Sequence, residues 1–96
     1  MNRSEIIAQL TLHKPVLAER FGVTLLALFG SVVRGTAHES SDIDILVAFD
    51  RPATSDSYFG VQFYLEDLLG RPVDLVTTKA LRPELKPYIE KEVLYV

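Results

Sequence analysis

Three apolar stretches along the chain have the length and composition of β-strands, and they lie at residues 23–29, 42–49 and 73–77. Each is rich in Val, Ile, Leu or Phe and is bounded by Gly, Pro, Ser or Asp, which favour turns. The second stretch is apolar on both of its alternating faces beyond Asp44, which is typical of a central strand covered on both sides. The pattern therefore predicts a small sheet with 42–49 in its middle.

Outside these stretches, apolar residues recur three or four positions apart, which is the spacing of helices. Capping and breaking residues predict four helices, which begin at Ser4, at Pro15, at Ser55 or Asp56, and at Pro83. Gly22 is expected to end the second helix and Gly70 the third, and the last runs to about Glu92. This order of elements predicts an α/β (α+β) sandwich, a small mixed β-sheet flanked by helices that cover mainly one face.

Composition limits the classes of protein to which the chain can belong. A length of 96 residues suits one modest core, so residues 1–96 are predicted to form a single domain. Cysteine is absent, which excludes disulfides and thiolate metal sites. The sequence shows neither a signal core nor an apolar run of membrane-spanning length, so a soluble cytoplasmic protein is expected. The net charge of −3 argues against long nucleic acid as the main partner.

The strongest chemical signal is a Gly-Ser pair, a spacer of ten residues, and then two aspartates one residue apart. Gly30-Ser31 follows the first predicted strand, and Asp42 and Asp44 open the second. Alternate residues of a strand face the same way, so these two carboxylates are expected roughly 6.6 Å apart on one face. Such a pair can hold two Mg²⁺ ions about 3.5–4 Å apart, as in two-metal phosphoryl chemistry.

Each residue of this motif also has an ordinary explanation. An Asp-x-Asp pair can be a solvated strand end, and Gly30 alone can be a plain turn. The conjunction favours a nucleotide site, because carboxylates that enter a buried strand are costly unless they are paired or bound to metal. Gly30 would let phosphate approach the backbone, and Ser31 adds an amide and a hydroxyl. Arg34 either reaches phosphate oxygens or forms an exposed salt bridge.

The motif resembles the signature of the DNA polymerase beta-type nucleotidyltransferase superfamily, and it lies in the stretch LFGSVVRGTAHESSDIDILVAF. More narrowly, the chain resembles the minimal nucleotidyltransferases (MNT proteins), antitoxins that pair with HEPN-domain ribonucleases. The similarity extends to PVDLVT and to the tail LRPELKPYIEKEVLYV. It implies the nucleotidyltransferase fold for the whole chain. It also implies that AMP passes from ATP to a tyrosine hydroxyl of a partner HEPN toxin, which is thereby silenced.

The resemblance also assigns a role to Asp74, which lies in the apolar stretch 73–77 where an unpaired aspartate is unexpected. It matches the third acidic residue of the superfamily's metal cluster, although an Asp that caps the next turn would have the same pattern. Asp42, Asp44 and Asp74 are then the catalytic and metal-binding residues for Mg²⁺. Gly30, Ser31 and Arg34 bind the nucleotide. Asp74 would accept the proton that leaves the attacking hydroxyl.

Two other functions remain open from the sequence. The chain could neutralise a partner by binding alone, or transfer a nucleotide to a small molecule or an RNA end. Relatives of the latter kind usually carry an extra helical domain, so the acceptor is expected to be held by another subunit. A homo- or hetero-oligomer is expected for the same reason. The C-terminal tail either closes the core or forms a partner surface, because several of its residues are apolar: Tyr88, Val93, Leu94, Tyr95 and Val96.

Overall fold

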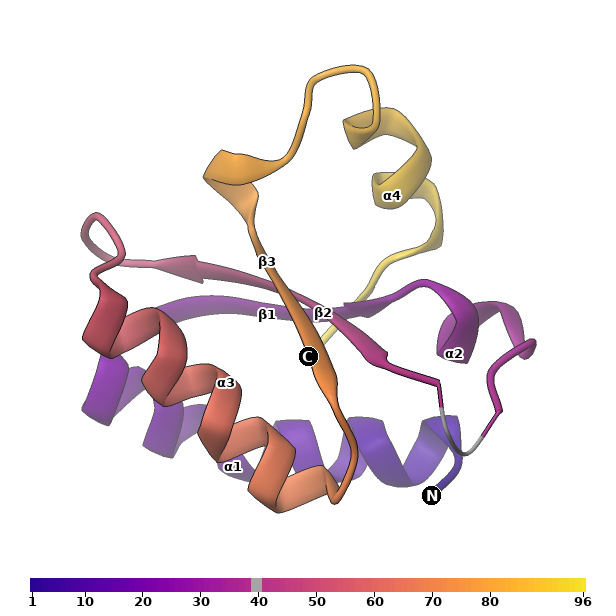
Figure 1. Ribbon diagram of the computed structural model, residues 1–96, viewed down its shortest axis with the longest axis horizontal. Helices are drawn as coiled ribbons and strands as arrows, with labels where there is room; N and C mark the ends of the chain where they lie inside the picture. Colours follow the sequence, from indigo (N-terminus) through magenta and orange to yellow (C-terminus); the bar gives the residue numbers. More distant parts are fainter. Residues whose placement is uncertain (39–40) are drawn as a thin grey trace.

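A mixed sheet of four strands forms the centre of the computed structural model, which describes residues 1–38 and 41–96 (Figure 1). The strands are β1 (Val23–Phe29), β2 (Ile43–Phe49), β3 (Val73–Thr77) and β4 (Leu94–Tyr95). Their order across the sheet is β3-β2-β1-β4. β2 pairs with β3 in parallel, whereas β1 pairs with both β2 and β4 in antiparallel fashion. The predicted mixed sheet is therefore confirmed. The second predicted strand is an inner one as expected, but it begins at Ile43 and leaves Asp42 outside.

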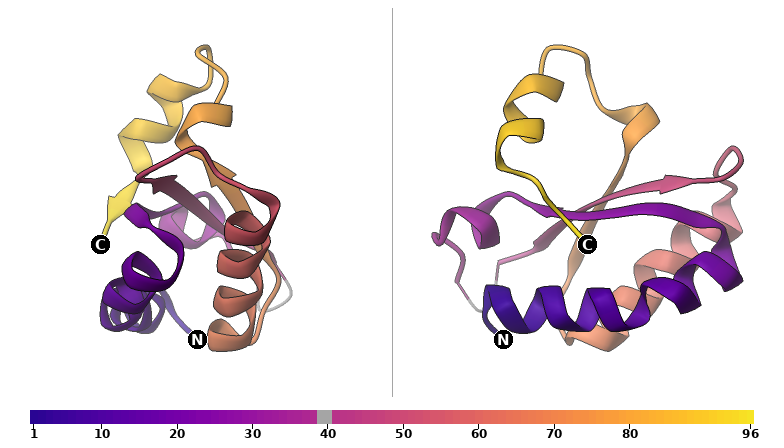
Figure 2. Two further views of the ribbon diagram at one scale, coloured as in Figure 1. Left: turned by 90° about the vertical axis from the view of Figure 1, so that its left-hand side faces the viewer. Right: turned by 180° about the vertical axis from the view of Figure 1, so that it is seen from behind.

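The two long helices cover one face of the sheet, and the shorter elements near the C-terminus lie on the other (Figures 1 and 2). The long helices are α1 (Arg3–Phe21) and α3 (Ser55–Leu69). On the other side are the 3₁₀ turn η1 (Thr78–Ala80) and α4 (Lys86–Glu92), while α2 (Ser31–Arg34) is a single turn directly after β1. Within the described part of the chain, no helix combines the length and the hydropathy that crossing a membrane requires.

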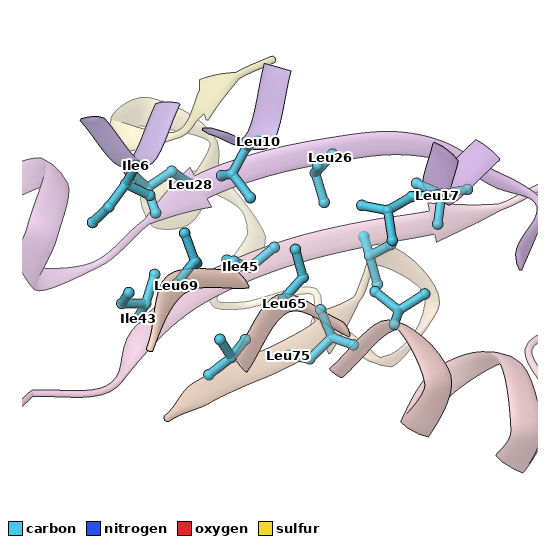
Figure 3. Packing of buried hydrophobic residues seen from close by; sticks show 14 of the residues in the cluster. Ile6, Leu10, Leu17, Leu26, Leu28, Ile43, Ile45, Leu65, Leu69 and Leu75 are labelled. Carbon is cyan, nitrogen blue, oxygen red and sulfur yellow. The ribbon is translucent and has the colours of Figure 1, made fainter. Parts of the chain in front are cut away.

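The main hydrophobic core lies between the sheet and the two long helices (Figure 3). It contains side chains that are fully shielded from solvent, among them Ile6, Leu10, Leu17, Leu26, Leu28, Ile43, Ile45 and Leu65. A smaller cluster on the opposite face is built on Ala27, Phe29 and Leu46. It is covered only in part, by Leu81, Ile89 and Val93 from the C-terminal segment. The thinly covered face is therefore the one on which polar groups can meet a ligand.

The prediction of two N-terminal helices separated at Pro15 is wrong. α1 is continuous from Arg3 to Phe21 with Pro15 in its interior, and its N-cap is Asn2 rather than Ser4. An interior proline removes one helical hydrogen bond and costs about 3 kcal/mol. The helix continues because Leu10 and Leu17, two turns apart on the same stripe, are both buried against the sheet. Packing on both sides of the proline outweighs its local cost.

Other helix boundaries also differ from the predictions. Thr54, not Ser55 or Asp56, caps α3 with a reciprocal hydrogen-bond pair to Ser57. The last helix begins at Lys86 rather than at Pro83, and the chain before it contains turns such as the bond from the Leu85 N–H to the Arg82 carbonyl. At α3 several adjacent residues could each cap the helix. α4 has no side-chain cap and instead carries Pro87 in its first turn, where the missing N–H of a proline costs no helical hydrogen bond.

The C-terminal tail forms an edge strand that the sequence pattern did not predict. Leu94 and Tyr95 pair with β1, and the Val96 amide donates to the Leu26 carbonyl at 3.0 Å. Val93 and Val96 pack against the two hydrophobic clusters, whereas the side chain of Tyr95 is 61% exposed. The tail thus closes the core with some residues and presents others to solvent.

Candidate active site

The turn between β1 and α2 is built on Gly30, whose backbone angles are φ +77° and ψ −150°. L-residues with a side chain rarely adopt this conformation. A Cβ atom at Gly30 would also overlap the carboxylate of Asp44. The glycine therefore lets β1 turn sharply and lets Asp44 come close to the backbone. A side chain at this position would cost stability as well as access for a phosphate.

Strand pairing on both sides of β2 brings the acidic residues together. Asp44 is paired with Phe29 on β1 and with Asp74 on β3. Its neighbours Ile43 and Ile45 point into the main core, so the Asp44 side chain faces the thinly covered side of the sheet. Asp42 lies just before β2 and is exposed. The residues predicted to act together are thus placed at the same end of the sheet.

The surroundings of Asp44 disfavour its ionised form. Burial, followed by the negative charge of Asp74 and a hydrogen bond to that side chain, raises the pKa of Asp44 above 3.8. Asp42 adds a smaller repulsion, and a hydrogen bond from the Ser31 amide acts in the opposite direction. Carboxylates crowded in this way are stabilised by a cation, because a cation relieves both the burial of charge and the repulsion.

The donor set at this end of the sheet fits a hard cation. Mg²⁺ prefers carboxylate oxygens and keeps part of its shell for water and phosphate. Asp44 and Asp74, paired across β2 and β3, carry such oxygens, and Asp42 lies near enough to repel the Asp44 carboxylate. Within residues 1–38 and 41–96, no three acidic or histidine side chains already converge on a single point as a preformed metal cage would.

Glu92, a residue that the sequence did not suggest, contacts the Gly-Ser turn. Its Oε1 accepts a hydrogen bond from the Gly30 amide at 3.2 Å. The Arg34 Nη1 donates to both Glu92 oxygens at 3.1 Å. The salt bridge that was one alternative for Arg34 is therefore present, and contact of Arg34 with phosphate stays a prediction. No sequence signal distinguishes Glu92 from its neighbours, because it lies at the end of α4, 58 residues away from Arg34 along the chain.

Comparison with known proteins agrees with this geometry. Residues 10–96 match the family model described as a nucleotidyltransferase domain. The chain is 46% identical over 92 residues to the protein adenylyltransferase MntA of Thermococcus cleftensis, a match that covers 96% of this chain and 93% of the relative.

Solved structures give the same result. One described as a minimal nucleotidyltransferase has a TM-score of 0.76 and 36% identity, and the match covers 98% of this chain and 95% of that one. A toxin-antitoxin crystal structure with AMP-PNP has a TM-score of 0.70 and 27% identity, over 99% of this chain and 72% of the other.

Proposed function

Because this chain belongs to the nucleotidyltransferase-domain family and is a nucleotidyltransferase, we propose that it transfers AMP from ATP to a tyrosine hydroxyl of a HEPN-domain toxin. It would thereby act as the antitoxin of that protein. One observation carries the chemistry: Asp44 and Asp74 are paired across neighbouring strands beside the Gly30-Ser31 turn. Carboxylates for cations and backbone amides for phosphate are thus next to each other.

The residues of the chain have distinct tasks in this reaction. The Gly30-Ser31 turn and Arg34 would bind the β- and γ-phosphates through amide and guanidinium donors. Asp42, Asp44 and Asp74 would hold two Mg²⁺ ions, which supply Lewis acidity at the phosphates and charge neutralisation when bound. The acceptor hydroxyl oxygen would form a bond to the α-phosphorus while the bond from that phosphorus to the β-phosphate oxygen breaks. Asp74 would accept the hydroxyl proton, and pyrophosphate would leave.

Relatives support the nature of the acceptor. A relative named protein adenylyltransferase aligns over nearly the whole chain. A toxin-antitoxin complex has the same fold at 27% identity and contains AMP-PNP, an analogue of ATP. An adenylyltransferase moves AMP, and a hydroxyl side chain of a protein is a suitable nucleophile for that group. A toxin with an accessible tyrosine is therefore the acceptor that we propose.

Mass spectrometry with labelled ATP tests this function. The purified chain would be incubated with a HEPN toxin, Mg²⁺ and ATP labelled either at the α- or at the γ-phosphate. We expect the label to enter the toxin only from α-labelled ATP, with the mass of one adenylyl group for each modified tyrosine. Label from the γ-position would show phosphoryl transfer instead and would refute the proposal.

A pair of variants separates catalysis from inhibition by binding alone. Asp44→Asn should abolish transfer, whereas Asp67→Asn, which removes an exposed carboxylate from α3, should leave transfer unchanged. If the Asp44 variant still neutralises the toxin as well as the wild type does, inhibition proceeds by binding and the enzymatic role is wrong.

A further inference from the structure

Two of the groups expected to bind phosphate are already occupied by a carboxylate of the chain itself. The Gly30 amide and the Arg34 guanidinium both donate to Glu92. The Glu92 side chain is 25% exposed, so these bonds are made by a carboxylate that is largely withdrawn from water. A carboxylate and a phosphate oxygen are both anionic acceptors and compete for the same donors.

This competition cannot be avoided at Gly30. A backbone amide has one hydrogen, and at 3.2 Å the Gly30 hydrogen points at the Glu92 Oε1. Arg34 has five N–H donors, so it can serve two anions at once. However, a second anion at Arg34 would still be repelled by the first. A phosphate that takes the Gly30 amide must therefore displace the Glu92 carboxylate.

We propose that Glu92 is an internal competitor of the nucleotide: its carboxylate fills part of the phosphate site in the free protein and leaves it when ATP binds. This inference rests on the proposed nucleotide binding at the Gly30-Ser31 turn. It adds that the occupancy of this site is coupled to the C-terminal segment, because Glu92 is the last residue of α4 and lies just before β4.

The C-terminal segment, α4 and β4, is held to the rest of the protein at several places, and Glu92 is one of them. β4 pairs with β1, and the Val96 carbonyl accepts a hydrogen bond from Lys14 Nζ at 2.6 Å. Between α4 and β4, the Val93 amide donates to the Ile89 carbonyl and so closes the end of α4. Displacement of Glu92 therefore releases one of the contacts that hold α4 over the thinly covered face, while β4 stays attached to the sheet.

Titration calorimetry with ATP and Mg²⁺ on three proteins tests the inference. Glu92→Gln removes the competing charge at nearly constant volume. Glu90→Gln is the matched control, since it removes a carboxylate of the same helix whose ion pair, with Lys86 at 3.9 Å, lies on the surface. We expect Glu92→Gln to bind ATP about fivefold more tightly than the wild type, the size of one charge-assisted contact. The Glu90 variant should match the wild type.

Each other result has a definite meaning. An unchanged or weaker affinity of folded Glu92→Gln overturns the competition and makes Glu92 a residue that only positions Arg34. If neither wild type nor either variant binds ATP, nucleotide binding itself fails, and the competition fails with it. Should Glu92→Gln not fold, hydrogen exchange on the wild type decides: saturating ATP should accelerate exchange of the Val93 amide, and an unchanged rate overturns the inference.

Discussion

The replacement Gly30→Ala should destabilise the protein by two separable effects. The backbone at Gly30, with φ +77° and ψ −150°, is unfavourable for any residue with a side chain and costs about 1–3 kcal/mol. The new Cβ would also lie 2.8 Å from the Cγ of Asp44 and overlap its carboxylate. Forcing such a contact costs about another 1–3 kcal/mol. The free energy of unfolding should therefore fall by about 2–6 kcal/mol.

A double-mutant cycle separates the two effects. In an Asp44→Ala background the carboxylate is gone, and the closest remaining atom to the methyl group introduced at position 30 is the Cβ of residue 44, at 3.0 Å. Gly30→Ala should then lose the overlap with the carboxylate, while the 3.0 Å approach to the Cβ of residue 44 keeps part of the steric cost. The coupling energy between the two positions should therefore be positive and no larger than about 1–3 kcal/mol. Urea denaturation followed by circular dichroism gives all four free energies.

Gly35 provides a matched control. It has nearly the same φ, +76°, but a Cβ there would meet no atom within 4 Å. Gly35→Ala should cost about 1–2 kcal/mol, the usual penalty of a left-handed residue, in either background. Equal costs of Gly30→Ala with and without the Asp44 carboxylate would refute the overlap. A Gly30→Ala cost no larger than that of Gly35→Ala would refute the special role of the turn.

Three further predictions concern stability and association. Asp44→Asn, measured with a chelator, should be more stable than the wild type at pH 7 and should lose this advantage as the pH falls towards 3.8. With a raised folded-state pKa, ionisation of Asp44 costs stability, and this cost starts above the unfolded-state pKa and is complete above the folded-state pKa. A stability difference that grows towards acid pH would contradict this. Pro15→Ala should raise the free energy of unfolding by about 2 kcal/mol, the helix penalty less the gain in unfolded-chain entropy, and no increase in urea midpoint would show that α1 bends to absorb the proline. Tyr95→Ala should weaken binding to a second copy or to the toxin with little change in melting temperature, since its side chain is 61% exposed; a lower melting temperature with unchanged affinity would assign Tyr95 to the fold alone.

Local patterns along the chain were sufficient to predict three of the four strands, among them those that carry Asp44 and Asp74. The apolar stretches with turn residues on both sides identified β1, β2 and β3, because burial requires the same apolar side chains whatever the topology. The alternation of a strand explains why Asp44 faces away from the core that holds Ile43 and Ile45, whereas Asp42, expected on the same strand, lies just before it. These properties depend on neighbouring residues and therefore survive without knowledge of the rest of the chain.

Tertiary packing decided what local preference could not. Pro15 favours a helix start, yet the shared burial of Leu10 and Leu17 keeps α1 continuous. The short strand β4 forms only because the β1 edge is available to pair with it. The bonds of Glu92 to the Gly30 amide and to Arg34 join residues 62 and 58 positions apart, so no periodicity or motif could have indicated them. The sequence by itself identified the residues that we propose for phosphate and cations. The folded chain decided that Glu92 contacts the Gly30 amide and Arg34, because contacts between distant segments exist only after the sheet has formed.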